Sequence, residues 1–434
     1  MKIIHWLLNN KSAGQTIAKN TFWLFAGQMT SRFLRAAIVI YAARVLGAES
    51  WGAFSYALGI AAFLTIFSDI GINALITKEA ARHPELKDRY LSTAFFTKIG
   101  LLAIFIITTV IFFPYLTKIE EAAAIMPILI FVFAFDTLRD LGSALSRALE
   151  KMQIEAGIQI FTNFAIVLLG FAFLAVMPSP RSLAFAYAIG SGLGLIAIFY
   201  ILREHFQNLF GNFHKELIRP ILATAWPFGL MGLMGAIMLN TDIIMLGWLR
   251  SALEVGYYSA AQKPVQLLYI LPTLLATSIF PILARLAKSA ADEGKGILEK
   301  YVGRVILISI PITLIGVLFP GLIINLLFGG EYSPAIETFR LLMLTVVIVY
   351  PSTLIGNAIF AYDHQKAFIG FVLIAVFGNV LFNLIFIPPF GIEGAAIATI
   401  LTQLLTNALI WRKAKKITGL RVWPAIKKLL AVSG

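Results

Sequence analysis

The sequence predicts an all-α polytopic membrane protein with about twelve transmembrane helices. Hydrophobic residues make up 59% of the 434 positions and charged residues only 13%, whereas a soluble domain is about half apolar and about a quarter charged. The apolar residues also occur in runs of about 20 or more, which is enough to cross a hydrocarbon core about 30 Å thick. Most charged residues lie between these runs, as they do in chains that cross a bilayer repeatedly.

Proline, glycine, asparagine and charged residues separate the apolar runs and set the expected helix ends. From the positions of these separating residues, we expect helices near 21–46, 51–76, 90–114, 123–147, 155–177, 182–202, 220–247, 255–284, 301–319, 334–361, 367–387 and 393–412. Two connections, near 46–51 and 387–393, are so short that the helices on either side are expected to be closely joined.

Lysine and arginine predict the orientation of the helices. Alternate connections and both terminal segments hold 24 of these residues, and the opposite connections hold only Lys118, Arg181 and Arg250. Cytoplasmic connections are enriched in Lys and Arg. We therefore expect a multi-pass protein of the cell (inner) membrane with both termini in the cytoplasm. The alternation also favours an even number of helices, because one missed helix would disrupt it.

Two short similarities indicate an internal repeat. Residues 23–25 (WLF) are echoed by 226–228 (WPF), and 51–55 (WGAFS) by 255–259 (VGYYS). Six predicted helices separate the copies, so both halves would have the same orientation, and such parallel repeats place a substrate site between two bundles near the membrane midplane. The expected division is a cytoplasmic N-terminal segment 1–20, a six-helix bundle 21–203, a cytoplasmic linker 204–219, a second six-helix bundle 220–412 and a basic cytoplasmic tail 413–434.

Several function classes are disfavoured. The sequence has no cysteine, and its five histidines fall in predicted connections or tails, so neither a metal site nor another cofactor is expected. The net charge of +13 is spread between apolar runs as a topology signal, which argues against a nucleic-acid partner. The sequence contains no Walker A motif, dinucleotide fingerprint or HExxH motif. We therefore do not expect an enzyme.

Two arginines within the first helix are the strongest candidates for a binding role. A charged residue at a helix centre costs about 2.5–3.5 kcal/mol on insertion scales. Arg32 and Arg35 are three residues apart and share a helix face, which Gln28 extends. Their own helix offers no acid near their depth, so we expect them to face water or an anion. Lys263 is a further candidate, because Pro264 beside it would bend the helix and form a gate next to a cation.

Other charged residues within the predicted helices are interpreted as ion pairs or gating groups. Asp136, Arg139 and Asp140 have i, i+3 and i+4 spacing and can neutralise one another, so a structural role is favoured for them. Glu337 and Arg340 have the same spacing. Charged residues without such a local partner are Asp69, Lys98 and Asp242.

Five segments, in order along the chain, resemble the polysaccharide and O-antigen (Wzx-like) flippases of the multidrug/oligosaccharidyl-lipid/polysaccharide (MOP) exporter superfamily. The segments are RVLGAESWGAFSYA (44–57), FSDIGINALITKEAAR (67–82), NTDIIMLGWLRSALEVGYYSAAQK (240–263), LLFGGEYSPA (326–335) and FIPPFGIEGAAIAT (386–399). Each motif is loose alone, but five in the right order are fairly specific, and the likeness extends over nearly the whole chain. Arg44 matches the Arg-x-Leu-Gly turn of that family and is expected to anchor the outer end of the first helix.

The resemblance implies two six-helix bundles around a central cavity that opens to one side at a time. It also implies export of a polyprenyl-diphosphate-linked oligosaccharide from the cytoplasmic to the outer leaflet for surface polysaccharide biosynthesis, with a glycan polymerase or glycosyltransferases as possible partners. Family members line the cavity with cations. Arg32, Arg35 and Lys263 are the candidates here, although they match no family motif residue by residue.

Two alternatives stay open. A cation-coupled multidrug exporter of the same superfamily would favour a cavity richer in carboxylates, whereas this chain has 35 Lys and Arg against 22 Asp and Glu. A membrane glycosyltransferase that uses lipid-linked donors is disfavoured, because the longest outer connection, near 319–334, is short for a catalytic domain. Coupling to the membrane potential, to Na⁺ or to H⁺ is also open.

Overall fold

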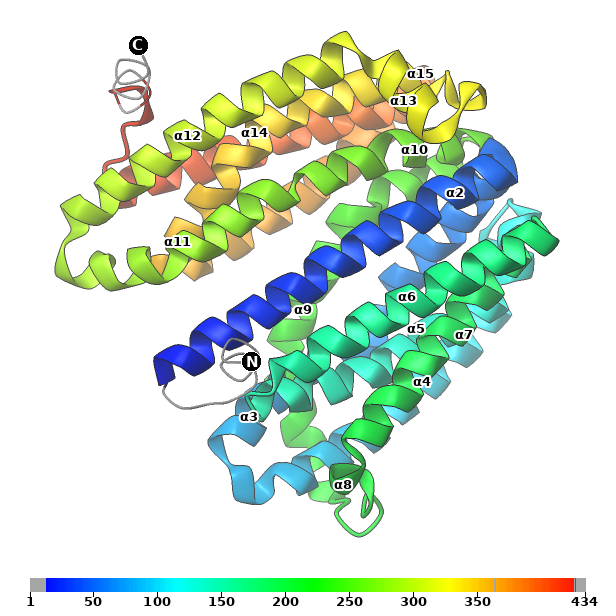
Figure 1. Cartoon of the computed structure of the whole chain (residues 1–434), viewed down its shortest axis with the longest axis vertical. Coiled ribbons are helices and arrows are strands. Elements are labelled where there is room, and N and C mark those ends of the chain that lie inside the picture. Colours follow the sequence, from blue (N-terminus) through cyan, green and yellow to red (C-terminus); the bar gives the residue numbers. More distant parts are fainter. Residues whose placement is uncertain (1–12, 363, 425, 427–434) are drawn as a thin grey trace, which may run out of the picture. The chain divides into compact units, whose positions relative to one another are not determined.

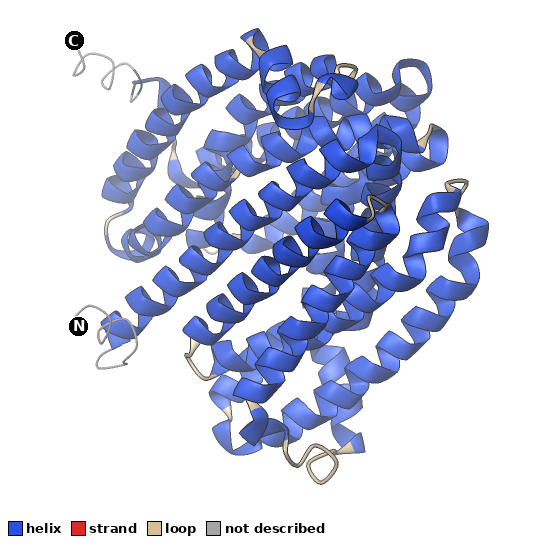
Figure 2. Ribbon diagram, turned by 45° about the vertical axis from the view of Figure 1, so that its right-hand side comes forward, coloured by secondary structure: helices blue, strands red, loops and turns tan. Residues whose placement is uncertain are grey.

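The structure is a computed structural model that describes residues 13–362, 364–424 and 426. Within this part all regular secondary structure is helical, loops and turns connect the helices, and no strand is present (Figure 2). The α-helices are α2 (Ala13–Asp69), α3 (Ile72–Arg82), α4 (Lys87–Leu116), α5 (Glu120–Ala148), α6 (Met152–Val176), α7 (Pro180–Ile201), α8 (Arg203–Phe206), α9 (Ile218–Leu249), α10 (Ala252–Leu268), α11 (Ile270–Ser289), α12 (Ala291–Leu318), α13 (Pro320–Phe328), α14 (Ala335–Ala361) and α15 (Gln365–Thr418). Short 3₁₀ turns are η1 (Pro84–Leu86), η2 (Lys215–Leu217) and η3 (Gly330–Tyr332).

The predicted all-α membrane fold is confirmed. Among the described residues, 10 helical stretches are long and apolar enough to cross a membrane. The two longest, of 64 and 51 residues, exceed by far the 20 or so residues that one crossing needs. The expected total of about twelve fits these lengths, and the exact number stays a prediction.

Both short connections are confirmed as tight joints. α2 breaks at Gly47 (φ 76°, ψ 170°) and α15 at Gly391 (φ 57°, ψ −129°), while the helices continue on both sides. Positive φ is costly for residues with a Cβ and not for glycine. Each glycine therefore joins two consecutive spans without an intervening loop.

The chain divides into two compact units, of which the first extends to Asn240. In this unit α2 packs mainly on α6 and α5, and α7 packs on both α5 and α6 (Figure 1). Small residues allow the close approach: a Cβ added at Gly27 of α2 would lie 2.8 Å from Ala156 Cα of α6. In membranes, such contacts between small residues bring helix backbones together.

The second unit begins at Thr241 and contains the end of α9 and helices α10 to α15. α14 forms its centre, because it packs against α15, α12, α11 and α10. The boundary between the units lies inside α9 rather than in the connection before it. The predicted linker 204–219 stays a prediction, and part of it is held to α4, where the Thr93 hydroxyl accepts a hydrogen bond from His214 N at 3.2 Å.

The predicted helix 51–76 is wrong at its end. α2 stops at Asp69, and α3 starts at Ile72 after a turn in which Ile70 (φ 46°) and Gly71 (φ 82°) have positive φ. The turn packs on α9, where a Cβ on Gly71 would lie 2.3 Å from Ala225 O. Tertiary packing against a helix distant in sequence produces this break, so periodicity along the chain does not reveal it.

Three other predicted boundaries are corrected. The helix expected at 255–284 is two helices, α10 and α11, which separate at Tyr269. The helix expected from 301 begins at Ala291, with Asp292 and Glu293 in its first turn, where acids interact favourably with the helix dipole. The expected open connection 319–334 contains α13 and η3.

Candidate functional site

Gln28, Arg32 and Arg35 lie along α2 at i, i+4 and i+7, so they share one face of the helix. All three side chains are exposed on the first unit. α2 itself packs against α6 and α5. We call these three residues the cationic face. The close spacing of its two guanidinium groups suits a ligand with more than one negatively charged oxygen.

Arg35 is held in place by α6. Its Nε and Nη2 donate to Asn163 Oδ1 at 3.3 and 3.2 Å, and Asn163 Nδ2 donates to Gln159 O at 2.8 Å. Arg35 also interacts electrostatically with Asp136 of α5. The absence of an acid on its own helix therefore does not leave Arg35 without a counter-charge, because a neighbouring helix supplies one. This corrects the premise that both arginines lack a partner.

Arg32 differs from Arg35. Within the described residues no hydrogen bond or ion pair of its side chain is found, and its charged neighbour is Arg35. Two like charges on adjacent turns repel each other. Arg32 is thus the cation of this face with the greatest capacity to bind an anion.

Asp136, Arg139 and Asp140 come together on α5. Arg139 Nη1 lies 2.6 Å from Asp136 Oδ1, and Nη2 lies 3.2 Å from Asp140 Oδ1. The Arg139 side chain is only 15% exposed. The three residues form one ionic cluster within a single helix.

Lys98 of α4 is fully buried. Its Nζ donates to Asp69 Oδ1 at 2.7 Å and to Asn73 Oδ1 at 2.8 Å. Asp69 ends α2 and Asn73 lies in the first turn of α3, so the ammonium group bridges the two sides of the strained turn. These contacts make Lys98 and Asp69 an ion pair that fixes the helix break.

Asp242 is the centre of a buried polar site in the second unit. Its carboxylate accepts hydrogen bonds from Tyr258 Oη (2.6 Å), Asn383 Nδ2 (2.7 Å), Thr399 Oγ1 (2.7 Å) and Asn379 Nδ2 (3.1 Å). The residue is 4% exposed. A buried carboxylate needs such donors, a proton or a cation to offset its lost hydration. The four donors provide this compensation for Asp242.

The remaining predicted residues belong to the second unit. Lys263 is half-buried in α10 and engaged with a neighbouring group. α10 continues through Pro264 to Leu268, and the expected bend and gate beside Lys263 stay a prediction. Glu337 and Arg340 form an exposed ion pair of 2.7 Å near the start of α14.

The described residues hold no group of three or more His, Cys, Asp or Glu side chains that could bind a metal ion. Sequence reasoning missed the partners of the two main sites: Asn163 of α6, Tyr258 of α10, and Asn379, Asn383 and Thr399 of α15. The sequence contains one signal of the site around Asp242. Asn379 and Asn383 lie four residues apart in an apolar helix, where polar side chains are costly in a bilayer and indicate a polar contact.

Comparison with known protein families identifies the family of this chain. Residues 17–287 match the polysaccharide biosynthesis protein family. The chain belongs to this family. Its curated relatives include the probable flippase AglR of Haloferax volcanii, which is 24% identical over 424 residues covering 92% of this chain and 84% of AglR. The predicted resemblance to flippases of the MOP superfamily is confirmed.

Solved structures show the same fold for this member of the polysaccharide biosynthesis protein family. The lipid II flippase MurJ, in an inward closed conformation, has a TM-score of 0.70 at 15% identity, with 94% of this chain and 92% of MurJ covered. A multidrug resistance MATE family transporter of the MOP superfamily, facing inward, has a TM-score of 0.67 at 14% identity, with 89% and 95% covered. This protein is thus a multi-pass membrane protein with a MOP-type fold.

Proposed function

We propose that this protein is a flippase that moves a polyprenyl-diphosphate-linked oligosaccharide from the cytoplasmic to the outer leaflet by alternating access. The family concerns polysaccharide biosynthesis, and its relative AglR is named a probable flippase. The lipid tail of such a substrate can stay in the bilayer. The charged and hydroxylated head must cross, and its charges are costly in hydrocarbon.

The cationic face carries this proposal. Arg32 and Arg35 are exposed within a span whose insertion penalises both charges. Two guanidinium groups offer paired donors that match the oxygens of a diphosphate. Gln28, one turn before Arg32, adds a neutral donor and acceptor. A wet site of this kind would replace the hydration and counterions that the head loses.

The membrane potential supports the direction of movement. In a membrane that is negative inside, moving two negative charges outward gains about 4–5 kcal/mol per 100 mV. Return of the empty cationic site is favoured by the same field. The cell membrane, the cytoplasmic termini and the partnership with a glycan polymerase or glycosyltransferases are part of this proposal.

Deletion of the gene in its native host tests the proposal. We expect loss of the surface glycan and accumulation of the lipid-linked precursor on the cytoplasmic side, with restoration by the wild-type gene. Minimum inhibitory concentrations of organic cations should stay unchanged. Normal amounts of surface glycan in the deletion strain would contradict the proposal.

A second candidate is a cation-coupled multidrug exporter. The buried carboxylate of Asp242 favours it, because a negative charge inside the second unit suits a coupling cation, and the MATE neighbour has the same fold. The deletion strain separates the two functions. Increased sensitivity to organic cations with normal surface glycan would favour the second candidate.

A further inference from the structure

We infer that a pocket at the end of the first unit where α2 begins is a subsite for sugar residues of the transported head group. This inference rests on the proposed function. The pocket has a volume of about 590 Å³ and is lined by Thr16, Asn20, Thr21, Leu24, Thr77, Ala81, Arg147, Ala148, Leu149, Glu150 and Met152. That volume lies in the usual range for small-molecule sites.

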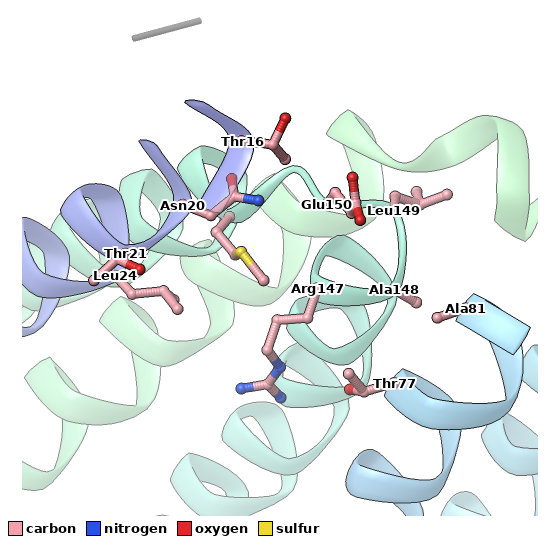
Figure 3. Close-up of a pocket in the computed structure, with 11 residues that line it drawn as sticks. Thr16, Asn20, Thr21, Leu24, Thr77, Ala81, Arg147, Ala148, Leu149 and Glu150 are labelled. Carbon is pink, nitrogen blue, oxygen red and sulfur yellow. The ribbon is translucent and has the colours of Figure 1, made fainter. Parts of the chain in front are cut away.

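Three segments form the pocket wall (Figure 3). Asn20 comes from α2, Thr77 from α3, and Arg147 and Glu150 from the end of α5 and the turn to α6. Glu150 has a left-handed backbone conformation (φ 57°) that reverses the chain between the two helices. Segments far apart in sequence thus bring hydrogen-bonding side chains to one hollow.

Two polar atoms of the wall lack a partner. Asn20 is 6% exposed, and its Oδ1 is buried with no hydrogen-bond partner among the described residues. Arg147 Nε is also buried without one. Buried polar atoms are normally paired, and an unpaired atom points to a missing ligand or water. Here one is an acceptor and the other a donor.

The charges of the pocket favour a neutral ligand over an anion. Arg147 is already paired with Glu155 at 3.1 Å, and Glu150 adds a second acid. A phosphate would meet these carboxylates, whereas sugar hydroxyls can both donate to Glu150 and accept from Arg147. Asn20 and the threonines provide further neutral donors and acceptors. Leu24 and Met152 supply apolar surface for the C–H groups of a sugar ring.

The pocket and the cationic face lie along the same helix, α2. Thr21, Gln28, Arg32 and Arg35 are spaced by seven, four and three residues, so they follow one stripe of the helix. At 1.5 Å per residue, Thr21 lies about 16 Å from Arg32 along the axis. A head group whose diphosphate contacts Arg32 would therefore extend its sugars toward the pocket, on the side that the proposed topology places in the cytoplasm.

Substitution of Asn20 gives the first test. Asn20→Ala removes an oxygen that has no partner in the described protein, so the amount of protein in the membrane should not change. We expect the export rate in the native host to fall about two- to tenfold, the effect of one lost uncharged hydrogen bond. Asn357→Ala is the control, because the one hydrogen bond found for Asn357 Nδ2 among the described residues stays within its own helix, to Thr353 O. Wild-type export by Asn20→Ala would overturn the inference.

Photocrosslinking identifies the occupant. p-Benzoylphenylalanine is placed at Met152, or at Leu24 if the first variant does not accumulate, and at exposed Leu168 of α6 as a control. Cells are fed tritiated galactose and glucosamine, or tritiated glycerol, before irradiation. We expect an adduct with sugar label at the pocket and none at Leu168.

Two results would overturn the inference. A pocket adduct labelled by glycerol without sugar label would identify a phospholipid as the occupant. An export-competent variant without any adduct would show an empty pocket. Both outcomes differ from failure of the proposed function, in which the gene deletion itself leaves export of the surface glycan unchanged.

Discussion

At the scale of residues, charged groups within the spans fall into two kinds. Lys98 is buried, Arg139 is half-buried, and both are bonded to acids, whereas Arg32 is exposed and has no such contact among the described residues. Pairing restores part of the hydration energy lost on burial, which suits a structural role. An exposed, unneutralised cation within a span suits a role in binding.

Arg139→Ala should reduce the amount and the thermal stability of the protein. The substitution leaves Asp136 and Asp140, which are 26% and 51% exposed, without their cation. Breaking a fully buried pair costs about 3–5 kcal/mol, so we expect a loss below that range and above that of an exposed pair. Fluorescence-detected size exclusion of detergent extracts measures both properties. Arg340→Ala is the control, because its ion pair is exposed and such pairs contribute about 0–1 kcal/mol. Full abundance of Arg139→Ala with loss of transport would instead place Arg139 in the binding site.

The sequence predicted the members of the α5 cluster because all three are neighbours on one helix. It did not predict the environment of Asp242, whose partners Asn379 and Thr399 are 137 and 157 residues away. It also did not predict that Asn163 holds Arg35, across 128 residues. Local spacing determines contacts within a helix, whereas contacts between helices depend on packing that a single sequence does not display.

At the scale of elements, two kinds of helix break occur. The joints at Gly47 and Gly391 lie in the two short connections that the sequence predicts directly. The break at Ile70–Gly71 lies inside an apolar run, and α9 and the Asp69–Lys98 pair hold it. Periodicity predicted the first kind and missed the second, because the second depends on a neighbour distant in sequence.

Gly71→Ala should destabilise the first unit strongly. The residue has positive φ, where alanine costs more than about 1 kcal/mol, and its Cβ would lie 2.3 Å from Ala225 O. Gly235→Ala of α9 is the matched control, because nothing lies within 4 Å of its Cβ and alanine improves a helix by about 0.5–1 kcal/mol. Melting of purified protein in detergent measures the difference. Equal melting temperatures for the two variants would rule out the proposed packing of this turn.

At the scale of the whole molecule, the orientation in the membrane is the first testable property. The chain has no cysteine, so single introduced cysteines report accessibility without background. Met177→Cys, between α6 and α7, should react with an impermeant thiol reagent in intact cells, and Ser289→Cys, at the end of α11, should react only after permeabilisation. Both positions are exposed. The reverse pattern would invert the proposed topology and the direction of transport.

The central claim is that a cationic face within the first helix binds the anionic head of a lipid-linked glycan. The two arginines carry a joint insertion cost of about 5–7 kcal/mol, so their removal should not impair insertion. Glutamine at position 35 can still donate a hydrogen bond to Asn163, which limits structural effects.

The most direct measurement is export of the surface glycan by the Arg32→Gln, Arg35→Gln double variant in a strain without the native gene. Membrane abundance is measured in parallel, and Arg32→Lys serves as a partial rescue, because lysine keeps the charge but lacks the planar fork. We expect export to be abolished or sharply reduced at unchanged abundance. Normal export by the double variant would contradict the claim, and a loss of export that only follows a loss of protein would assign both arginines a structural role.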